Sequence, residues 1–367
     1  MRRRLLVHDH GIDDERPIYV TGSFNDWQPG QEAFELKPTD QPNYYKIELE
    51  LPVETEWVEY KYTRGGWDAV ELDEQGGYVP NRRKAAGTKW QHTDHVNRWA
   101  GVKYEFPAAF LPVIEVISEA FEIPQLIRTR RIAALLPHDY YHSDKSYPVL
   151  YLQDGQNLFE DGAPFGSWGV DKRLASLASR DQGDVIIISI DHAEKQRMSE
   201  FTPSFNTQLG RGEGKKYVRF LADTLKPYID SHYRTKPESE HTGIGGSSLG
   251  GLISIYAGLM YPEVYDKFMI FSPSLWVTPH IPWELMDLND EFTGRVYLYG
   301  GEQESATLVD RLKNYRDELL ERTKPGNCAV KLEVDPNGQH NEARWGQEFP
   351  NAIEWLFFEE PKNDKLV

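Results

Sequence analysis

One segment of the chain has the residue types and spacing of a nucleophilic serine. Gly246, Ser248 and Gly250 form the pattern G-x-S-x-G, after a short predicted strand and before the small and apolar residues 249–257. A chain that turns this sharply from strand to helix gives its serine strained backbone angles, and side chains two positions away would collide. The pattern predicts that Ser248 presents its hydroxyl at a helix start. Ser247 is the competing serine, and a glycine-rich turn without chemistry is the alternative.

A serine nucleophile requires a base, and in a strand–turn–helix hydrolase the acid and then the histidine follow the serine along the chain. Two histidines follow Ser248. His280 lies in a segment flanked by prolines, whereas His340 follows the strand predicted over residues 330–334 through a short loop. Because a loop after the last strand can carry an imidazole over the turn, the sequence favours His340. A histidine on a surface loop is the alternative.

The third member of such a triad holds the imidazole in one tautomer and stabilises the imidazolium. We expect it just past the strand predicted over residues 295–299, where the loop contains Glu302 and Glu304. Spacing alone does not choose between them, and Asp335 in the final loop is a further candidate. The backbone N–H of Leu249, at the start of the predicted helix, would point at the developing oxyanion.

The elements that must position these residues differ between two parts of the chain. From residue 17 to 90 short alternating runs are separated by turn residues, which is typical of a small antiparallel, immunoglobulin-like β-sandwich. From about residue 104 onward, continuous apolar runs alternate with helical patterns, which indicates an α/β fold with a mostly parallel sheet. The sequence predicts two domains, residues 1–103 and 104–367.

Composition excludes several classes of function. The chain of 367 residues has 41 Lys and Arg against 58 Asp and Glu, a net charge of −17, so we expect no nucleic-acid partner and no binding to anionic membranes. The single cysteine, Cys328, excludes a disulfide framework. No histidine pair has a third ligand at fixed spacing, so no metal or other cofactor is predicted. The apolar run Leu5–Val7 is too short for a signal peptide, and we expect a cytoplasmic protein.

The second predicted domain resembles the "putative esterase" family of α/β-hydrolases, which includes enterochelin-esterase-like and S-formylglutathione-hydrolase-like enzymes. The resemblance runs from about Leu126 to Phe358. The segments that carry it are Tyr151–Phe159, Phe165–Asp171, Gly246–Gly251, Phe271–Trp276 and the signature His340-Asn341-Glu342-x-x-Trp345.

This resemblance implies an α/β-hydrolase fold, with Ser248 as nucleophile and His340 as base. It favours Glu304 over Glu302 as the acid, because the acid in similar enzymes often stands three residues after a glycine such as Gly301. The second oxyanion donor is then the backbone amide of Gln156, with that of Gly155 as the alternative. The resemblance also includes Arg197 and Glu200, either as a substrate clamp or as an ion pair that fixes a loop.

The first predicted domain resembles the glycogen- and starch-binding β-sandwich modules. The similar segments are Tyr19–Trp27, Glu59–Tyr62 and Gly66-Trp67. The resemblance implies that sugar-facing side chains are Trp27, Lys61, Trp67 and Asn81. The alternative is a module that keeps the fold and serves only for packing.

Together these observations predict a serine esterase that hydrolyses a carboxylic ester through an acyl-enzyme, with a small-molecule ester or an acylated glycan as substrate. Two alternatives remain open. One is a hydrolase of siderophore lactones or thioesters. The other is a glucan-binding scaffold with a vestigial hydrolase domain, against which the complete order of serine, acid and histidine argues.

Overall fold

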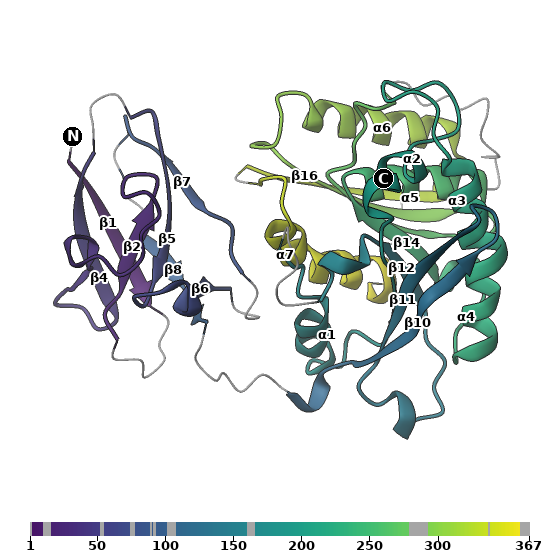
Figure 1. The fold of residues 1–367 in the computed structure, drawn as a ribbon, viewed down its shortest axis with the longest axis horizontal. Helices are drawn as coiled ribbons and strands as arrows, with labels where there is room; N and C mark the ends of the chain where they lie inside the picture. The colour runs from purple at the N-terminus through teal and green to yellow at the C-terminus, as the bar shows by residue number, and fades with distance from the viewer. Residues whose placement is uncertain are drawn as a thin grey trace. The chain divides into compact units, whose positions relative to one another are not determined.

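The protein divides by its internal contacts into two compact units, Met1–Glu105 and Phe106–Val367. The computed structural model describes residues 2–9, 16–51, 55–73, 78–88, 90, 93–100, 108–159, 166–278, 293–336 and 338–359 (Figure 1). The domain boundary predicted between residues 103 and 104 lies outside the described residues. Among those described, no helix combines the length and the apolar character that a bilayer crossing would require.

The second unit is built on one eight-stranded sheet with the order β10-β11-β13-β12-β14-β15-β16-β17. Strands β10, β11 and β13 pair antiparallel, and all other neighbours pair parallel, so the α/β fold with a mostly parallel sheet is confirmed. The strands are β10 Val113–Ile123, β11 Arg128–Leu136, β12 Val149–Gln153, β13 Ile186–Ile190, β14 Thr242–Ser247, β15 Lys267–Phe271, β16 Gly294–Gly301 and β17 Cys328–Asp335.

Helices cover both faces of this sheet, because its strands are apolar on both sides. On one face the core contains residues of α3, α4, α5 and α6; on the other it contains residues of α1 and α7 (Figure 1). The helices are α1 Val170–Ala178, α2 Arg197–Glu200, α3 Gly214–Phe220, α4 Lys226–His232, α5 Leu249–Met260, α6 Leu308–Arg322 and α7 Glu342–Ile353. Consecutive residues along a strand point to opposite cores: Ile270 faces the first and Phe271 the second.

The parallel strands bring distant parts of the sequence to one edge of the sheet. The carboxyl ends of β12, β14, β15, β16 and β17 are neighbours in register, with Ser247 beside Phe271 and Gly301 beside Asp335. In open α/β sheets, ligands bind outside these carboxyl ends. The fold therefore places the predicted nucleophile, acid and base at the same edge.

The first unit is all β, as predicted, but its sheets are not purely antiparallel, because β1 and β8 pair parallel. A four-stranded sheet β3-β4-β1-β8, a three-stranded sheet β2-β5-β7 and a pair β6-β9 make it up. Strands β1 and β4 share one apolar core with β2 and β5. The strands are β1 Arg2–Asp9, β2 Tyr19–Gly22, β3 Lys37–Pro38, β4 Tyr44–Glu50, β5 Trp57–Thr63, β6 Glu71–Leu72, β7 Arg82–Ala85, β8 Thr93–Val96 and β9 Arg98–Trp99.

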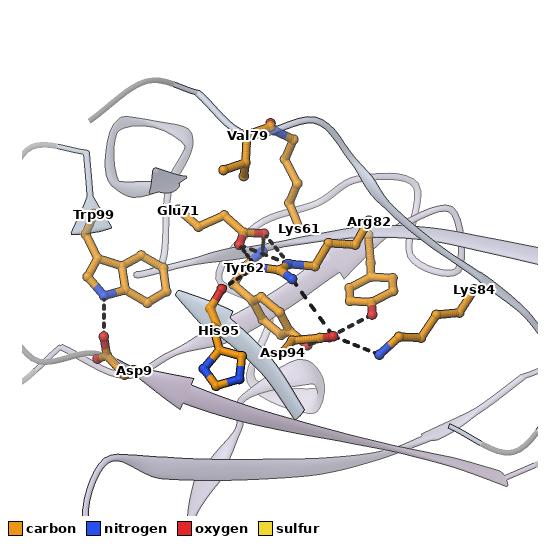
Figure 2. A network of polar contacts seen from close by, with 11 residues as sticks. Asp9, Lys61, Tyr62, Glu71, Val79, Arg82, Lys84, Asp94, His95 and Trp99 are labelled. Carbon is orange, nitrogen blue, oxygen red and sulfur yellow. Dashed lines mark hydrogen bonds and ion pairs between the residues drawn. The ribbon is translucent and has the colours of Figure 1, made fainter. Parts of the chain in front are cut away.

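A buried carboxylate joins the two larger sheets of this unit. Asp94 on β8 accepts hydrogen bonds from the hydroxyls of Tyr60 and Tyr62 at 2.7 and 2.8 Å and from Nζ of Lys84 at 2.9 Å. Figure 2 shows Tyr62, Arg82 and Lys84 arranged around it, and the Asp94 side chain is 9% exposed. Burial by itself would raise the pKa of Asp94, but the charges of Arg82 and Lys84 outweigh it and lower the pKa.

We predict that Asp94→Asn destabilises the first unit by about 3 kcal/mol, because it removes the buried charge that pairs with the partly buried Lys84. Hydrogen exchange of the β5 amides in the full chain would accelerate accordingly. Since the pKa of Asp94 is lowered by folding, its contribution is complete at neutral pH and is lost as the pH falls below the usual range of aspartate. The difference between wild type and variant should therefore shrink in acid.

The matched control is Asp223→Asn, which removes an exposed carboxylate 3.1 Å from Arg219 and should change stability by less than about 0.5 kcal/mol. Equal effects of the two substitutions would contradict the role given to Asp94.

Candidate active site

Ser248 lies in the sharp turn between β14 and α5, with φ 56° and ψ −123°. Two main-chain hydrogen bonds fix this strained conformation: the Ser248 N–H donates to the carbonyl of Phe271 at 3.0 Å, and the Ser274 N–H donates to the carbonyl of Ser248 at 3.0 Å. The Ser248 hydroxyl lies 3.3 Å from the Ser274 hydroxyl. A non-glycine residue held at positive φ by its surroundings is a feature that concentrates at functional sites.

The two glycines of the pattern are required by close approach. A Cβ on Gly250 would lie 2.8 Å from Oδ2 of Asp154 and 3.0 Å from Cβ of Gln153. A Cβ on Gly246 would lie 3.0 Å from the carbonyl carbon of Gly250. The turn therefore packs directly against the end of β12, which brings Ser248 next to the loop that follows that strand.

His340 and Glu304 form a close pair. Nδ1 of His340 lies 2.6 Å from Oε2 of Glu304, whose side chain is only 3% exposed. The other oxygen, Oε1, accepts hydrogen bonds from the Ser272 hydroxyl and the Gly301 N–H, both at 2.7 Å. The indole N–H of Trp345 donates to the same Ser272 hydroxyl at 2.9 Å, and the Trp345 ring stands edge-on to the imidazole at 4.9 Å.

The other two candidate acids have different surroundings. Glu302 is exposed, and its backbone N–H donates to the carbonyl of Asp335 at 2.9 Å. The carboxylate of Asp335 lies 2.5 Å from Arg344 and accepts a hydrogen bond from the Tyr299 hydroxyl at 3.1 Å. Of the three carboxylates, Glu304 is the one that contacts His340.

Two backbone amides expected to bind an oxyanion lie at helix starts. Leu249 is the first residue of α5, so its N–H has no partner within the helix. Gln156 lies in the 3₁₀ turn Gly155–Asn157. Its side-chain amide makes two hydrogen bonds to the backbone of His192: Nε2 donates to the carbonyl at 3.0 Å, and Oε1 accepts from the N–H at 2.9 Å.

Arg197 fixes the start of the same loop. Its Nε and Nη2 donate to the two carboxylate oxygens of Asp154 at 2.5 and 2.8 Å. Glu200 is fully buried and accepts instead from Arg128 at 2.7 Å and Arg130 at 2.6 Å. Arg197 and Glu200 therefore do not pair with each other: Arg197 holds Asp154 after β12, and Glu200 joins α2 to β11.

Ser248, His340 and Gln156 line a cavity of about 990 Å³. Its lining includes Ser248 and His340 together with Asp154, Gln156, Asn157, His192, Glu194, Lys195, Arg197, Met198, Ser247, Asn341, Glu342 and Trp345. A hollow of about 480 Å³ also reaches Ser248 and His340, and its apolar lining includes Leu209, Pro273, Trp276 and Leu308. A hydroxyl, an imidazole, a buried carboxylate and two amides are the groups that acyl transfer requires.

Sequence reasoning gave no role to Ser272 or to Trp345, which position Glu304 and His340. Both stand in segments that carry the family resemblance, and that is the signal that could have identified them. His280, the alternative base, lies outside the described residues. Within the described ranges, no group of three or more His, Cys, Asp or Glu could hold a metal ion.

Of the sugar-facing residues expected in the first unit, the structure brings two together. The rings of Trp27 and Trp67 lie 6.3 Å apart at 33° to one another, and Trp67 is 46% exposed. The Lys61 ammonium donates to the carbonyl of Val79, and burial lowers the pKa of Lys61. The Asn81 amide lies 3.5 Å from the Glu59 carboxylate.

Comparison with known proteins places the second unit in a family. The model of the family described as "Putative esterase" matches residues 123–356. The uncharacterized protein YbbA of Bacillus subtilis is 24% identical over 244 residues, which cover 62% of this chain and 92% of that protein. The crystal structure of the enterobactin esterase FES from Shigella flexneri superposes with a TM-score of 0.54 at 14% identity, covering 97% of this chain and 92% of that one. At 14% sequence identity, this structural similarity shows a shared fold and nothing more.

A shorter match links the chain to an amylolytic enzyme. An α-amylase of Niallia circulans is 39% identical over 84 residues, which cover 23% of this chain and 6% of that enzyme.

The geometry predicts different effects at the two loop glutamates. Glu304→Gln should lower kcat for p-nitrophenyl acetate by a factor of about 10³ to 10⁴, because the amide would favour the wrong imidazole tautomer. Glu302→Gln removes an exposed carboxylate from the same loop and should stay within about twofold of wild type. Rates are compared after circular dichroism has shown both variants to be folded. A large loss in Glu302→Gln alone would contradict the assignment.

Proposed function

Because this chain belongs to the "putative esterase" family, we propose that it hydrolyses carboxylic esters through an acyl-enzyme formed on Ser248. The observation that carries the proposal is the contact of 2.6 Å between His340 and the buried carboxylate of Glu304, both of which line the same hollow as Ser248. A base held by a carboxylate beside a serine is the arrangement that activates a hydroxyl for attack.

In the proposed mechanism the Ser248 hydroxyl attacks the ester carbonyl while Nε2 of His340 takes its proton. Glu304, through Nδ1, holds the imidazole and stabilises the imidazolium. The amides of Leu249 and Gln156 bind the oxyanion of the tetrahedral intermediate. As that intermediate collapses, the bond to the alcohol breaks and His340 returns the proton to the departing oxygen.

The second half of the reaction repeats these steps with water. His340 takes a proton from water, which attacks the acyl-enzyme, and the bond to Ser248 breaks as the proton returns to its oxygen. The products are a carboxylic acid and the free enzyme. Siderophore lactones and thioesters would pass through the same steps and differ in the group that leaves.

The proposal predicts that Ser248→Ala lowers kcat for p-nitrophenyl acetate by a factor of at least about 10³, because no other residue replaces the nucleophile. Ser247→Ala is the matched control: Ser247 lines the same cavity one position earlier, and its loss should cost less than about tenfold. Stopped-flow and steady-state assays of the two variants measure the effect. Unchanged turnover in Ser248→Ala would place the nucleophile elsewhere.

A second activity is supported in the first unit, where we propose that Trp27 and Trp67 bind a glucan. Indole rings offer flat apolar surfaces on which the apolar face of a pyranose can stack. The ring centroids lie 6.3 Å apart and Trp67 is half exposed, which supports this proposal. Part of the chain, 84 residues long, is also similar to an α-amylase. The proposal gives Lys61 a structural role, since its ammonium is bonded to Val79. An acylated glucan would then be a substrate that both units recognise.

The test is affinity electrophoresis of the full chain in gels that contain glycogen. We predict that Trp27→Ala and Trp67→Ala each weaken retardation by at least about fivefold, since the loss of a stacked aromatic costs about 1 kcal/mol or more. Trp57→Ala is the control, because Trp57 is 48% exposed in the same unit but stacks with Arg83 at 4.5 Å. An unretarded wild type, or equal losses in all three variants, would refute glucan binding at this pair.

A further inference from the structure

A carboxyl group that the proposed mechanism does not use lies in the wall of the cavity. Glu342 is the first residue of α7, two positions after His340, and it lines the same cavity as Ser248. Its Oε1 accepts a hydrogen bond from Nδ2 of Asn157 at 3.2 Å. Because Asn157 directly follows Gln156, this bond joins the segment of the proposed base to the segment of the proposed oxyanion donor.

The Asn157 side chain can form a hydrogen bond with Glu342 in either protonation state of the carboxyl group. Asn157 is 8% exposed, and within the part of the chain that the structure describes its Oδ1 has no hydrogen-bond partner. A half-turn of the amide exchanges Oδ1 and Nδ2 with little change of shape. Nδ2 then donates to an ionised carboxylate, and Oδ1 accepts from the O–H of a neutral carboxylic acid. The contact can therefore persist when Glu342 changes its charge.

The charges around Glu342 act in opposite directions. Burial, together with the charge of Asp154, raises the pKa of Glu342 to about 7 against the opposing charges of His340 and Arg197. Arg197 is itself held by both oxygens of Asp154, so its charge is largely compensated. The other titratable groups that line the cavity are His192, Glu194 and Lys195.

Building on the proposed esterase function, we propose that Glu342 is a specificity-determining residue that selects the charge of the substrate group lying beside His340. It favours neutral or cationic groups that carry hydroxyl or amine donors, and it disfavours a carboxylate. An ionised Glu342 repels an anionic group in the cavity, and because Glu342 is partly buried the two charges interact more strongly than in bulk water. A protonated Glu342 removes that repulsion and can itself donate a hydrogen bond.

The test uses two pairs of esters, each differing by one charge at nearly constant shape. The first pair is p-nitrophenyl 4-carboxybutanoate and p-nitrophenyl 4-carbamoylbutanoate, which vary the acyl side. The second is 3-carboxypropyl acetate and 3-carbamoylpropyl acetate, which vary the alcohol side. For each pair the ratio of kcat/KM, amide over carboxylate, is measured between about pH 6 and pH 8.5. The requirement for His340 as base is common to both substrates and cancels in this ratio.

We expect the ratio in wild type to rise about tenfold with pH for at least one pair, as Glu342 becomes ionised. Glu342→Gln keeps the size of the side chain and the acceptor for Asn157 but does not titrate, so its ratio should not depend on pH. Glu194→Gln is the control, since it removes an exposed carboxylate from the same cavity and should keep the pH dependence of wild type.

Two outcomes would overturn the inference, and they are distinguishable. If wild type hydrolyses the esters but Glu342→Gln has the same pH-dependent ratio for both pairs, Glu342 does not select charge and the esterase proposal stands. If folded wild type hydrolyses none of the four esters, the proposed function fails and the role of Glu342 fails with it.

Discussion

The site depends on the carboxylate of Glu304, whose two oxygens connect three parts of the second unit. Oε1 accepts from Ser272 and from the Gly301 N–H at 2.7 Å, and Oε2 lies 2.6 Å from Nδ1 of His340. Because the side chain is 3% exposed, water does not compete for these charge-assisted bonds. The imidazole is 47% exposed, so its orientation relies on Glu304 and on the Trp345 ring rather than on enclosure.

The parallel sheet makes this arrangement possible. Ser248 follows β14, Ser272 follows β15, Glu304 follows β16 and His340 follows β17, and these strands are neighbours in the sheet. The loop after β12 also lies at this edge, and the ion pair of Asp154 with Arg197 holds it in place. Polar side chains far apart in sequence thus meet at one edge, each on a short connection that follows a strand of the sheet.

The sequence predicted what local patterns encode. The turn at Ser248 and the alternation of apolar strands with helices depend on near neighbours, and the mostly parallel α/β fold was confirmed. The choice between Glu302 and Glu304 needed the family resemblance, because spacing does not tell which side chain of a loop turns inward. Local patterns do not predict contacts between distant segments. Two such contacts are the hydrogen bond from Ser272 to Glu304 and the hydrogen bond from the Lys61 ammonium to the carbonyl of Val79.

The proposed chemistry requires that His340 activates Ser248 as a nucleophile. The most direct measurement is labelling of the folded full chain with a fluorophosphonate, followed by peptide mapping of the modified residue. We expect modification of Ser248 in wild type and its loss in His340→Ala, because the serine is not activated without its base. Folded protein that takes up no label, or label on another residue, would contradict it.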